Sequence, residues 1–475
     1  MMEEFNNIIN GKKVQSGATF GVVNPANGNV FAHCQIADIP MVDRAVAAAR
    51  AAFPAWSKTS HDERKEKIHA LGDALEANMP DLMALVTAET GKPMAGLNGV
   101  GSGMEVGGSM AWTHYTADLD LPVDIVQDDD VASVRVFRKP LGVVASITPW
   151  NWPLMIAIWH VIPALRAGNT VVIKPSPLAP LAIIRFVEMA NQILPPGVLN
   201  VITGDASIGA ALSEHSDVDK IVFTGSTPTG RNIMQAASTN LKRLTLELGG
   251  NDAGIILDDV DVKDIAPKLF AAAFHNNGQT CACLKRLYVH ESIYEELCQE
   301  LAHLAKAVVV GDGMDDGVEL GPVQNKAQMA IVMELAEDAR ANGGRFIAGG
   351  HAIPGNGFFF APTIVADLED GARLVDEEQF GPIVPVIRYS NIEAIIERAN
   401  QNDNGLGGSV WSRDVAKATA LAQQLECGTA WVNDHGAVQP DAPFGGIKQS
   451  GFGVEFGSYG LEEYTSIQTV KITKT

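Results

Sequence analysis

Cysteine is scarce in this sequence, and the few cysteines present show no paired spacing. Only five occur in 475 residues, and an odd number without paired spacing does not fit the disulfide framework of a secreted domain. Cys281 and Cys283 form a CxC pair, but the sequence has no second Cys or His pair at the spacing of a zinc site. We therefore expect a protein of the reducing cytoplasm, and we expect no metal site.

Basic residues are also in deficit. The chain carries 35 Lys and Arg residues against 56 Asp and Glu residues, which gives a formal net charge of −21. Binding to a phosphate backbone needs clustered Lys and Arg, so this charge argues against a nucleic-acid partner. Any anionic cofactor must instead be held by local backbone amides or by single cations.

Long uninterrupted apolar runs are missing as well. The opening residues, MMEEFNNIINGKK, lack a basic stretch leading into an apolar one, so no secretory signal is visible. The most apolar stretch, residues 141–165, contains residues that a membrane helix accommodates only at a cost. We interpret this stretch as buried core and expect no membrane partner. The interrupting residues are Pro149, Asn151, Pro153, His160 and Pro163.

The sequence does contain a repeated alternation of short apolar strands and helices. Its length and its 46% hydrophobic content are enough for two or three globular domains. Repeated βαβ units predict a parallel sheet with helices on both faces, the architecture that binds dinucleotides. In the first half we expect strands at 143–147, 170–174, 198–202, 220–223 and 244–246, with helices at 154–165 and 178–194. In the second half we expect strands at 253–257 and 286–290, with helices at 265–274 and 292–308.

Cys281 stands in a setting that favours a reactive thiol. It lies in the stretch FHNNGQTCAC, where a small polar loop follows an apolar segment. Such loops present reactive side chains, and a thiol in a partly exposed, electropositive or amide-rich setting becomes a nucleophile as its thiolate. We therefore take Cys281 as the candidate nucleophile. The remaining cysteines are expected to be small buried apolar residues: Cys34, Cys283, Cys298 and Cys427.

Two further stretches complete a candidate site around Cys281. Glu247 lies in LTLELGGND, and Asn151 lies in TPWNWPL. With these motifs the sequence resembles the aldehyde dehydrogenase superfamily, whose signatures are P-W-N-x-P, then E-L-G-G, then G-Q-x-C. Glu247 and Cys281 stand at the separation found in that family. The likeness extends from NPANG near residue 24 to PFGGIKQSG near residue 443, and three ordered motifs are a far stronger signal than a lone glycine fingerprint.

The resemblance implies an α/β fold with three parts. These are a Rossmann-like parallel-sheet cofactor domain, a second α/β catalytic domain and a β oligomerisation arm. We expect the nucleotide-binding domain in residues 1–118 and 141–248, and the catalytic domain in 249–440. The arm and the C-terminal segment then occupy 119–140 and 441–475, and the arm implies a homodimer or homotetramer. On the residues alone, an ordinary hairpin explains the alternating stretch at 119–140 equally well.

The resemblance also implies a chemistry. Cys281 adds to an aldehyde to give a thiohemiacetal, and the Asn151 amide with the Cys281 backbone N–H stabilises the oxyanion. Hydride then passes to the nicotinamide, which leaves a thioester on Cys281. Glu247 activates water as general base, which favours a free carboxylic acid over transfer to coenzyme A. Glu455 matches a buried family glutamate assigned to proton relay, although a surface helix explains it as well.

For the cofactor, the resemblance implies NAD or NADP, with a slight preference for NAD. The expected GxGxxG is absent, and a GxxxxG turn that starts at Gly225 takes its place after a strand. Ser176 stands where many NAD-preferring members carry a Glu that binds ribose hydroxyls and repels a 2′-phosphate, so NADP use stays open. The positions that match cofactor-binding residues are Ile147, Trp150, Lys174, Ser176, Gly204, Phe223, Gly225, Ser226, Glu378 and Phe380.

For the substrate, the resemblance implies an apolar small-molecule aldehyde, either aliphatic or aromatic. Trp159 stands where members that oxidise succinate semialdehyde tend to carry an Arg, so the clamp for a carboxylate-bearing substrate is missing. The positions that match the aldehyde tunnel are Trp152, Ile156, Trp159, Val438 and Phe444.

Two other classes of function remain open at the level of sequence. Cys281 could serve a hydrolase or acyltransferase that works without nicotinamide, for which His275 is the only nearby partner. A binding protein that has kept the fold without turnover is the other. The joint presence of Cys281, Glu247 and Asn151 disfavours the binding protein.

Overall fold

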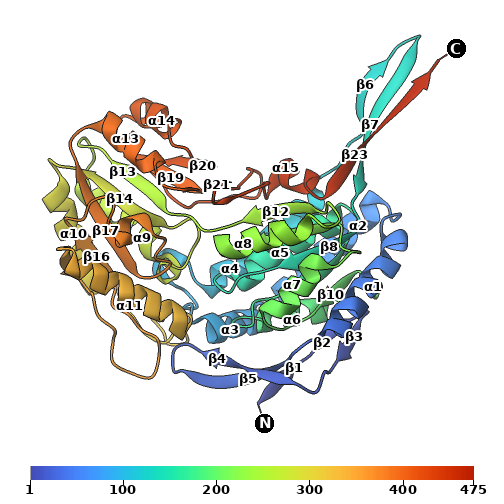
Figure 1. Cartoon of the computed structure of the whole chain (residues 1–475), viewed down its shortest axis with the longest axis horizontal. Coiled ribbons are helices and arrows are strands. Elements are labelled where there is room, and N and C mark those ends of the chain that lie inside the picture. The colour runs from blue at the N-terminus through green and yellow to red at the C-terminus, as the bar shows by residue number, and fades with distance from the viewer. Residues whose placement is uncertain (1, 475) are drawn as a thin grey trace.

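A computed structural model describes residues 2–474 of the chain and contains two large sheets, each covered by helices (Figure 1). The first sheet has the strand order β22-β12-β11-β8-β9-β10-β2-β3. Its strands are β2 (Asn7–Ile9), β3 (Lys12–Val14), β8 (Val143–Ile147), β9 (Thr170–Lys174), β10 (Leu199–Val201), β11 (Lys220–Thr224), β12 (Arg243–Glu247) and β22 (Gly451–Phe452). Beside it lies a small sheet of β1 (Glu3–Phe5), β4 (Thr19–Asn24) and β5 (Asn29–Gln35).

The centre of the first sheet is parallel, as the sequence predicts. Strand β8 pairs in parallel with both β9 and β11, and Ile147 lies opposite Lys174 on one side and Phe223 on the other. The carboxyl ends of these three strands therefore meet at one edge. Strands β8 and β9 coincide with the predicted ranges. The outer strands pair antiparallel with their neighbours, β22 with β12, β2 with β10 and β3 with β2. The sheet is therefore mixed at its edges.

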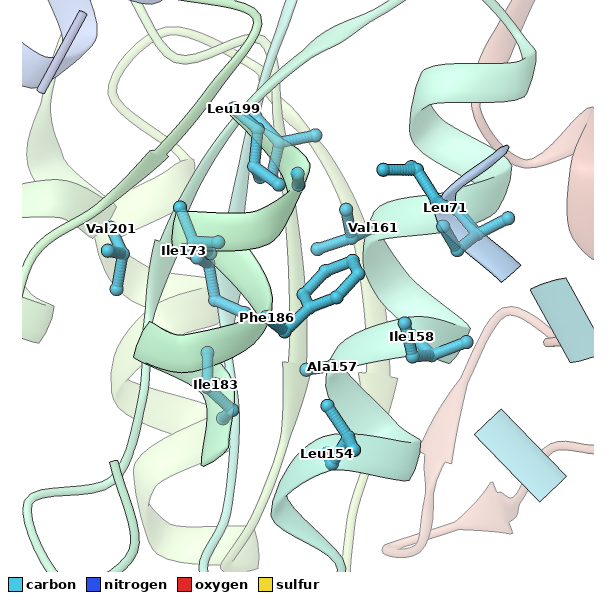
Figure 2. Packing of buried hydrophobic residues seen from close by; sticks show 14 of the residues in the cluster. Leu71, Leu154, Ala157, Ile158, Val161, Ile173, Ile183, Phe186, Leu199 and Val201 are labelled. Carbon is cyan, nitrogen blue, oxygen red and sulfur yellow. The ribbon is translucent and has the colours of Figure 1, made fainter. Parts of the chain in front are cut away.

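Helices bury the first sheet on both faces. In Figure 2 the Phe186 ring of α6 lies between Ile173 of β9 and Val161 of α5, within one continuous apolar cluster. The predicted helix at 178–194 is shorter in the structure, because Pro180 stands at its N-cap and its last residues form a turn before Pro195. The helices are α1 (Ile39–Trp56), α2 (His61–Ala77), α3 (Met79–Thr90), α4 (Ser102–Asp118), α5 (Pro153–Arg166), α6 (Leu181–Ala190), α7 (Ala206–Glu214) and α8 (Thr227–Ala237).

The second sheet has the order β15-β16-β17-β14-β13-β19-β20, and the predicted strands and helices of this half are confirmed to within three residues. Its strands are β13 (Asp252–Ile256), β14 (Leu284–His290), β15 (Arg345–Ala348), β16 (Thr363–Ala366), β17 (Ile383–Tyr389), β19 (Gly407–Trp411) and β20 (Thr429–Val432). Its helices are α9 (Val262–Phe274), α10 (Tyr294–Ala307), α11 (Lys326–Ala341), α12 (Arg373–Asp376), α13 (Ile392–Asn400) and α14 (Val415–Ala422).

The two sheets meet where β12 ends and β13 begins. Strand β12 ends at Glu247 in the first sheet, and β13 begins at Asp252 in the second. Strand β22 returns from the C-terminal region and pairs with β12, so that Gly451 lies opposite Glu247. This short junction sets Glu247 between the two halves of the molecule. The remaining short elements are η1 (Leu97–Gly99), η2 (His275–Gly278), β18 (Asn404–Gly405), β21 (Ile447–Lys448) and α15 (Gly457–Glu462).

A third, three-stranded antiparallel sheet projects from the body of the molecule, at the upper right of Figure 1. It consists of β6 (Asp124–Asp128), β7 (Ala132–Pro140) and β23 (Thr465–Thr473), with β7 in the middle. The stretch at 119–140 is thus a hairpin to which the last strand is added. Large apolar side chains are exposed on it: Ile125, Val126, Val131, Ile467 and Ile472. Among residues 2–474, no helix is both long enough and apolar enough to span a bilayer.

Candidate active site

The carboxyl ends of β8 and β11 open onto a cavity of about 230 Å³, which we call the thiol cavity. Ligands of open parallel sheets bind at such ends, where the strand order reverses. Here the order reverses at β8, since β9 lies on one side of it and β11 on the other. The cavity brings together seven of the predicted site residues: Trp150, Asn151, Gly225, Ser226, Cys281, Glu378 and Phe380.

A second cavity of about 620 Å³ adjoins the first and shares Trp150, Gly225 and Ser226 with it. We call it the nucleotide cavity. It runs between α7 and α8, where Ala206 and Ile233 contribute apolar walls. Four more predicted residues line it: Ile147, Lys174, Ser176 and Phe223.

Gly204 is placed differently from the other predicted cofactor residues. Although it belongs to the described part of the chain, it lines neither cavity; Asp205 and Ala206, which follow it, line the nucleotide cavity instead. A Cβ at Gly204 would approach Ile208 Cγ1 to 2.6 Å. Close packing against Ile208, near the start of α7, therefore explains why residue 204 is a glycine.

The Asn151 side chain is held against the cysteine loop. Its Nδ2 donates to the carbonyl oxygen of Gln279 at 2.9 Å, which leaves one amide hydrogen for another acceptor. The backbone carbonyl oxygen of Asn151 accepts from Asn276 Nδ2 at 3.1 Å and from Lys92 Nζ at 3.0 Å. The amide thus has a fixed direction at the wall of the thiol cavity.

A buried ion pair behind Asn151 was not predicted from the sequence. Lys92 and Glu105 have fully buried side chains and pair with each other, and burial lowers the pKa of Lys92 to about 8. Glu105 Oε1 also accepts the backbone N–H of Leu154 at 2.9 Å at the start of α5. The pair therefore fixes both the Asn151 backbone and the helix that follows it. A lone lysine in ETGKP gives no signal of such a role.

Cys281 is half-buried and sits where the loop leaves η2 for β14. Burial raises the pKa of its thiol to about 12, although Lys285 lowers it. Glu247 and Glu378 raise the pKa further. Carboxylates thus lie around Lys285, the cation that lowers the pKa of this thiol.

Glu247 is buried at the end of β12. Burial raises the pKa of its carboxyl well above the ordinary value, and Glu455 adds to the effect. Within residues 2–474, neither carboxylate oxygen has a hydrogen-bond partner, which is costly for a buried polar group. A Cβ at Gly445 would lie 3.2 Å from Glu247 Oε1, so the glycine leaves room for the carboxylate. Glu247 lies behind the thiol cavity.

Glu455 is also buried, so the surface helix suggested as its alternative is wrong. It forms a β-bridge with Phe444, and its Oε1 lies 3.2 Å from His160 Nε2. The same ring nitrogen lies 3.0 Å from Thr224 Oγ1, while Nδ1 lies 3.0 Å from Ser146 Oγ. A continuous polar chain therefore leads from Glu455 through His160 into β8.

An apolar cluster packs against Cys281 and contains three of the predicted substrate residues, Trp159, Val438 and Phe444. Three aromatic residues that sequence reasoning missed belong to it: Trp112, Trp431 and Phe456. The Phe456 ring lies 4.7 Å from that of Trp159 and 5.6 Å from that of Trp112. Trp152 and Ile156 form a separate buried cluster with Met155, against which Trp159 also packs. Trp152 and Ile156 therefore support Trp159 from this second cluster.

His275 faces the wrong cysteine for a Cys-His hydrolase. Its Nε2 lies 3.8 Å from Cys283 Sγ, and burial lowers the pKa of its ring to about 4. All five cysteines are free. Across residues 2–474, no cluster of three or more His, Cys, Asp or Glu side chains is arranged to hold a metal ion.

The two cavities fit a nicotinamide dinucleotide. The apolar slot between α7 and α8 suits a flat base, and Lys174 and Ser176 at its wall are polar groups for a ribose. At the other end, Phe380 packs edge-on against Trp150, with ring centroids 5.4 Å apart. A Cβ at Gly225 would overlap the Phe223 ring, so this turn approaches its neighbour as closely as only glycine allows.

Comparison with known proteins agrees with this geometry. A model of the aldehyde dehydrogenase family matches residues 12–470. The chain belongs to the aldehyde dehydrogenase family. It is 40% identical over 476 residues to phenylacetaldehyde dehydrogenase from Pseudomonas fluorescens, with 96% of this chain and 93% of that protein covered. It is 37% identical to retinaldehyde dehydrogenase 3 from Homo sapiens, with 96% of this chain and 90% of that protein covered.

A solved structure extends the comparison to three dimensions. The NAD+ complex of an aldehyde dehydrogenase from Bacillus cereus superposes with a TM-score of 0.96 at 35% identity, covering 100% of this chain and 97% of the other. The predicted α/β class and the predicted family are thereby confirmed. The chain is an enzyme that oxidises aldehydes with NAD or NADP, which excludes the hydrolase without nicotinamide and the binding protein without turnover.

Proposed function

We propose that Cys281 is the nucleophile of a hydrolytic aldehyde dehydrogenase whose product is the free carboxylic acid. One observation carries this proposal: Cys281 and Asn151 line the same cavity as Trp150, Glu378 and Phe380. Addition to an aldehyde followed by hydride loss requires a sulfur, an amide and a ring-sized space beside them.

In this proposal Cys281 loses its thiol proton to solvent, and the thiolate adds to the carbonyl carbon to form the oxyanion of a thiohemiacetal. The free Asn151 amide hydrogen and the Cys281 backbone N–H donate to this oxyanion. The backbone carbonyl oxygen of Asn151 is held by Lys92 and Asn276, and its side chain is held by Gln279. The nicotinamide, when bound, supplies the hydride acceptor. Loss of hydride leaves a thioester on Cys281.

Glu247 then acts as the general base for hydrolysis of the thioester. Its buried, unpartnered carboxyl and its raised pKa support this role, because a carboxylate with a raised pKa is a stronger base toward water than an exposed one. Glu455 lies close enough to raise the pKa of Glu247, and His160 lies 3.2 Å from Glu455. The proton taken from water passes from Glu247 to Glu455.

We further propose that the natural aldehyde is apolar and carries an aromatic ring. Trp159, Phe444 and Phe456 surround the sulfur with rings that pack edge-on or stacked, and such rings bind another ring through the same geometry. Similarity to a phenylacetaldehyde dehydrogenase points the same way. NAD is slightly preferred, as in the NAD+ complex of the Bacillus cereus relative. NADP use stays open, since Ser176 neither binds a second ribose hydroxyl as a Glu does nor repels a 2′-phosphate.

The assembly and domain roles belong to the same proposal. Residues 1–118 and 141–248 bind the nucleotide, 249–440 carry Cys281, and 119–140 with 441–475 form the arm and C-terminal segment. Exposed Ile125 and Ile467 on the projecting sheet support a homodimer or homotetramer. Five free cysteines fit a cytoplasmic location.

The test is a panel of aldehydes with NAD and with NADP, followed by absorbance of the reduced cofactor. Purified protein should oxidise phenylacetaldehyde with a higher kcat/KM than succinate semialdehyde. Cys281→Ala should remove the activity, whereas Cys283→Ala, its matched control two residues away, should retain it. Full activity in Cys281→Ala would refute the nucleophile assignment.

A further inference from the structure

Lys285 is a buried cation that the proposed mechanism does not use. It is the second residue of β14, and its side chain is only 2% exposed. Its ammonium contacts three oxygens: the carbonyl of Gly250 at 3.0 Å, the carbonyl of Cys281 at 2.8 Å, and Glu378 Oε1, with which it forms an ion pair. A lysine has three N–H donors, so all of them are engaged.

Glu378 is fixed by these contacts in a defined way. Its Oε1 accepts from Lys285 and also from the Gly250 backbone N–H at 3.0 Å. Two donors on one oxygen leave Oε2 as the oxygen available to a ligand, and Glu378 lines the thiol cavity. A Cβ at Gly249 would overlap Oε2, so the glycine keeps that space clear.

The same ammonium also holds the nucleophile loop. By binding the Cys281 carbonyl and Glu378 together, Lys285 connects two residues that are 97 positions apart in the sequence and face one cavity. Lys285 also lowers the pKa of the Cys281 thiol, against burial and the charges of Glu247, Glu378 and Asp252, which raise it. Loss of this charge would leave carboxylates alone around the sulfur.

We propose that Lys285 is a positioning residue that directs the free oxygen of Glu378 toward the nicotinamide ribose and fixes the Cys281 loop beside it. The inference rests on the proposed function, in which Glu378 binds the cofactor. In this inference Lys285 acts through Glu378 and Cys281. Charge-assisted hydrogen bonds are the strong ones, so an ammonium is better suited to this task than a neutral donor.

The first test is cofactor binding, which needs no turnover. The dissociation constant of NAD is measured by titration calorimetry for the parent, Lys285→Met, Lys285→Gln, Glu378→Gln and the double variant Lys285→Met/Glu378→Gln. Each Lys285 variant should weaken NAD binding about tenfold, the effect of losing one hydrogen bond to a charged group. The double variant should be no weaker than Glu378→Gln, because Lys285 acts through Glu378.

The second test is alkylation of Cys281 by iodoacetamide in cofactor-free protein as a function of pH, with Cys281→Ala subtracted to remove the other thiols. Lys285→Met and Lys285→Gln should move the midpoint to higher pH, and Glu378→Gln should move it to lower pH. A role in stability alone would lower the melting temperature and leave both midpoint and NAD affinity unchanged.

Four results decide the question. Weaker NAD binding and a raised midpoint in a folded Lys285 variant support the proposal. Parent-like affinity and midpoint in both Lys285 variants overturn it, as does a double variant whose losses simply add. Failure of the parent protein itself to bind NAD overturns the cofactor site and this proposal together, which separates that outcome from a failure of Lys285 alone.

Discussion

Lys92 Nζ lies 3.0 Å from the carbonyl oxygen of Asn151, and both residues are buried. The ammonium also pairs with Glu105 and lies over the Trp152 ring, 3.2 Å from its centroid. Lys92 thus connects Asn151, which carries the proposed oxyanion donor, to Glu105 of α4. Removal of either charge would leave the other buried and unpaired.

Lys92→Met should therefore lower the free energy of unfolding by about 3 kcal/mol or more, because breaking a buried pair leaves Glu105 uncompensated. It should also lower kcat, since Asn151 loses one of the two donors that hold its carbonyl oxygen. Urea unfolding and steady-state kinetics measure the two effects. Lys268→Met is the matched control, because its pair with Asp264 is exposed and should cost about 0.5 kcal/mol or less.

Glu247→Gln should stall the enzyme after one turnover. Addition and hydride loss need only Cys281 and Asn151 in the proposed mechanism, whereas hydrolysis needs the carboxylate. Rapid mixing should give a burst of reduced cofactor close to one equivalent per Cys281, followed by a slow phase. Mass spectrometry should detect the acyl group on Cys281. Turnover at the parent rate would show that another base performs the hydrolysis.

The pH dependence of stability gives a separate measure of Glu247. In the unfolded chain this group ionises near its ordinary value of 4.5, whereas the folded protein retains the proton to higher pH because burial raises the pKa. The folded state therefore binds more protons above pH 4.5, and this group reduces the free energy of unfolding as pH rises toward the folded pKa. Glu247→Gln should gain stability relative to the parent as pH rises. Urea unfolding of both proteins across this range measures the difference, and a constant difference would contradict a raised pKa.

Much of the architecture could be predicted because it is encoded locally. Strands β8 and β9 are short apolar runs bounded by polar or proline residues, and their ends were predicted to the residue. The motif residues Asn151 and Cys281 stand in sequence-local signatures, and the structure places both at the thiol cavity. Periodicity and turn chemistry carry the strand ends without reference to distant contacts, whereas the two motifs indicate the site through their resemblance to those of the family.

The ion pairs of the site could not be predicted in this way. Lys285 pairs with Glu378 and Lys92 with Glu105 through contacts that only the folded chain creates, and a lysine looks the same in sequence whether it is buried or exposed. The same limit applies to the surroundings of Cys281, because the carboxylates that raise the pKa of its thiol come from distant segments.

Cofactor choice should respond to a single residue at the nucleotide cavity. Ser176→Glu would add a carboxylate that accepts ribose hydroxyls and repels a 2′-phosphate, beside Lys174 on the same wall. NADP affinity should fall about tenfold or more relative to NAD, measured as the ratio of the two dissociation constants. Ser176→Ala is the control and should leave that ratio within about twofold of the parent. An unchanged ratio in Ser176→Glu would mean that residue 176 does not face the ribose.

The projecting sheet offers a last prediction about assembly. Ile467 is 72% exposed and Ile125 is 62% exposed, on a sheet that stands away from the body of the chain (Figure 1). Apolar side chains on a free sheet are usually covered by another chain. Replacement of both by Lys should convert the proposed dimer or tetramer to a smaller species, measured by light scattering. The melting temperature should fall with it, because assembly stabilises each subunit. Met333→Lys, a control on α11 with a 46% exposed side chain, should leave the mass unchanged. A parent protein that is monomeric at micromolar concentration would refute the assignment of this sheet as an oligomerisation arm.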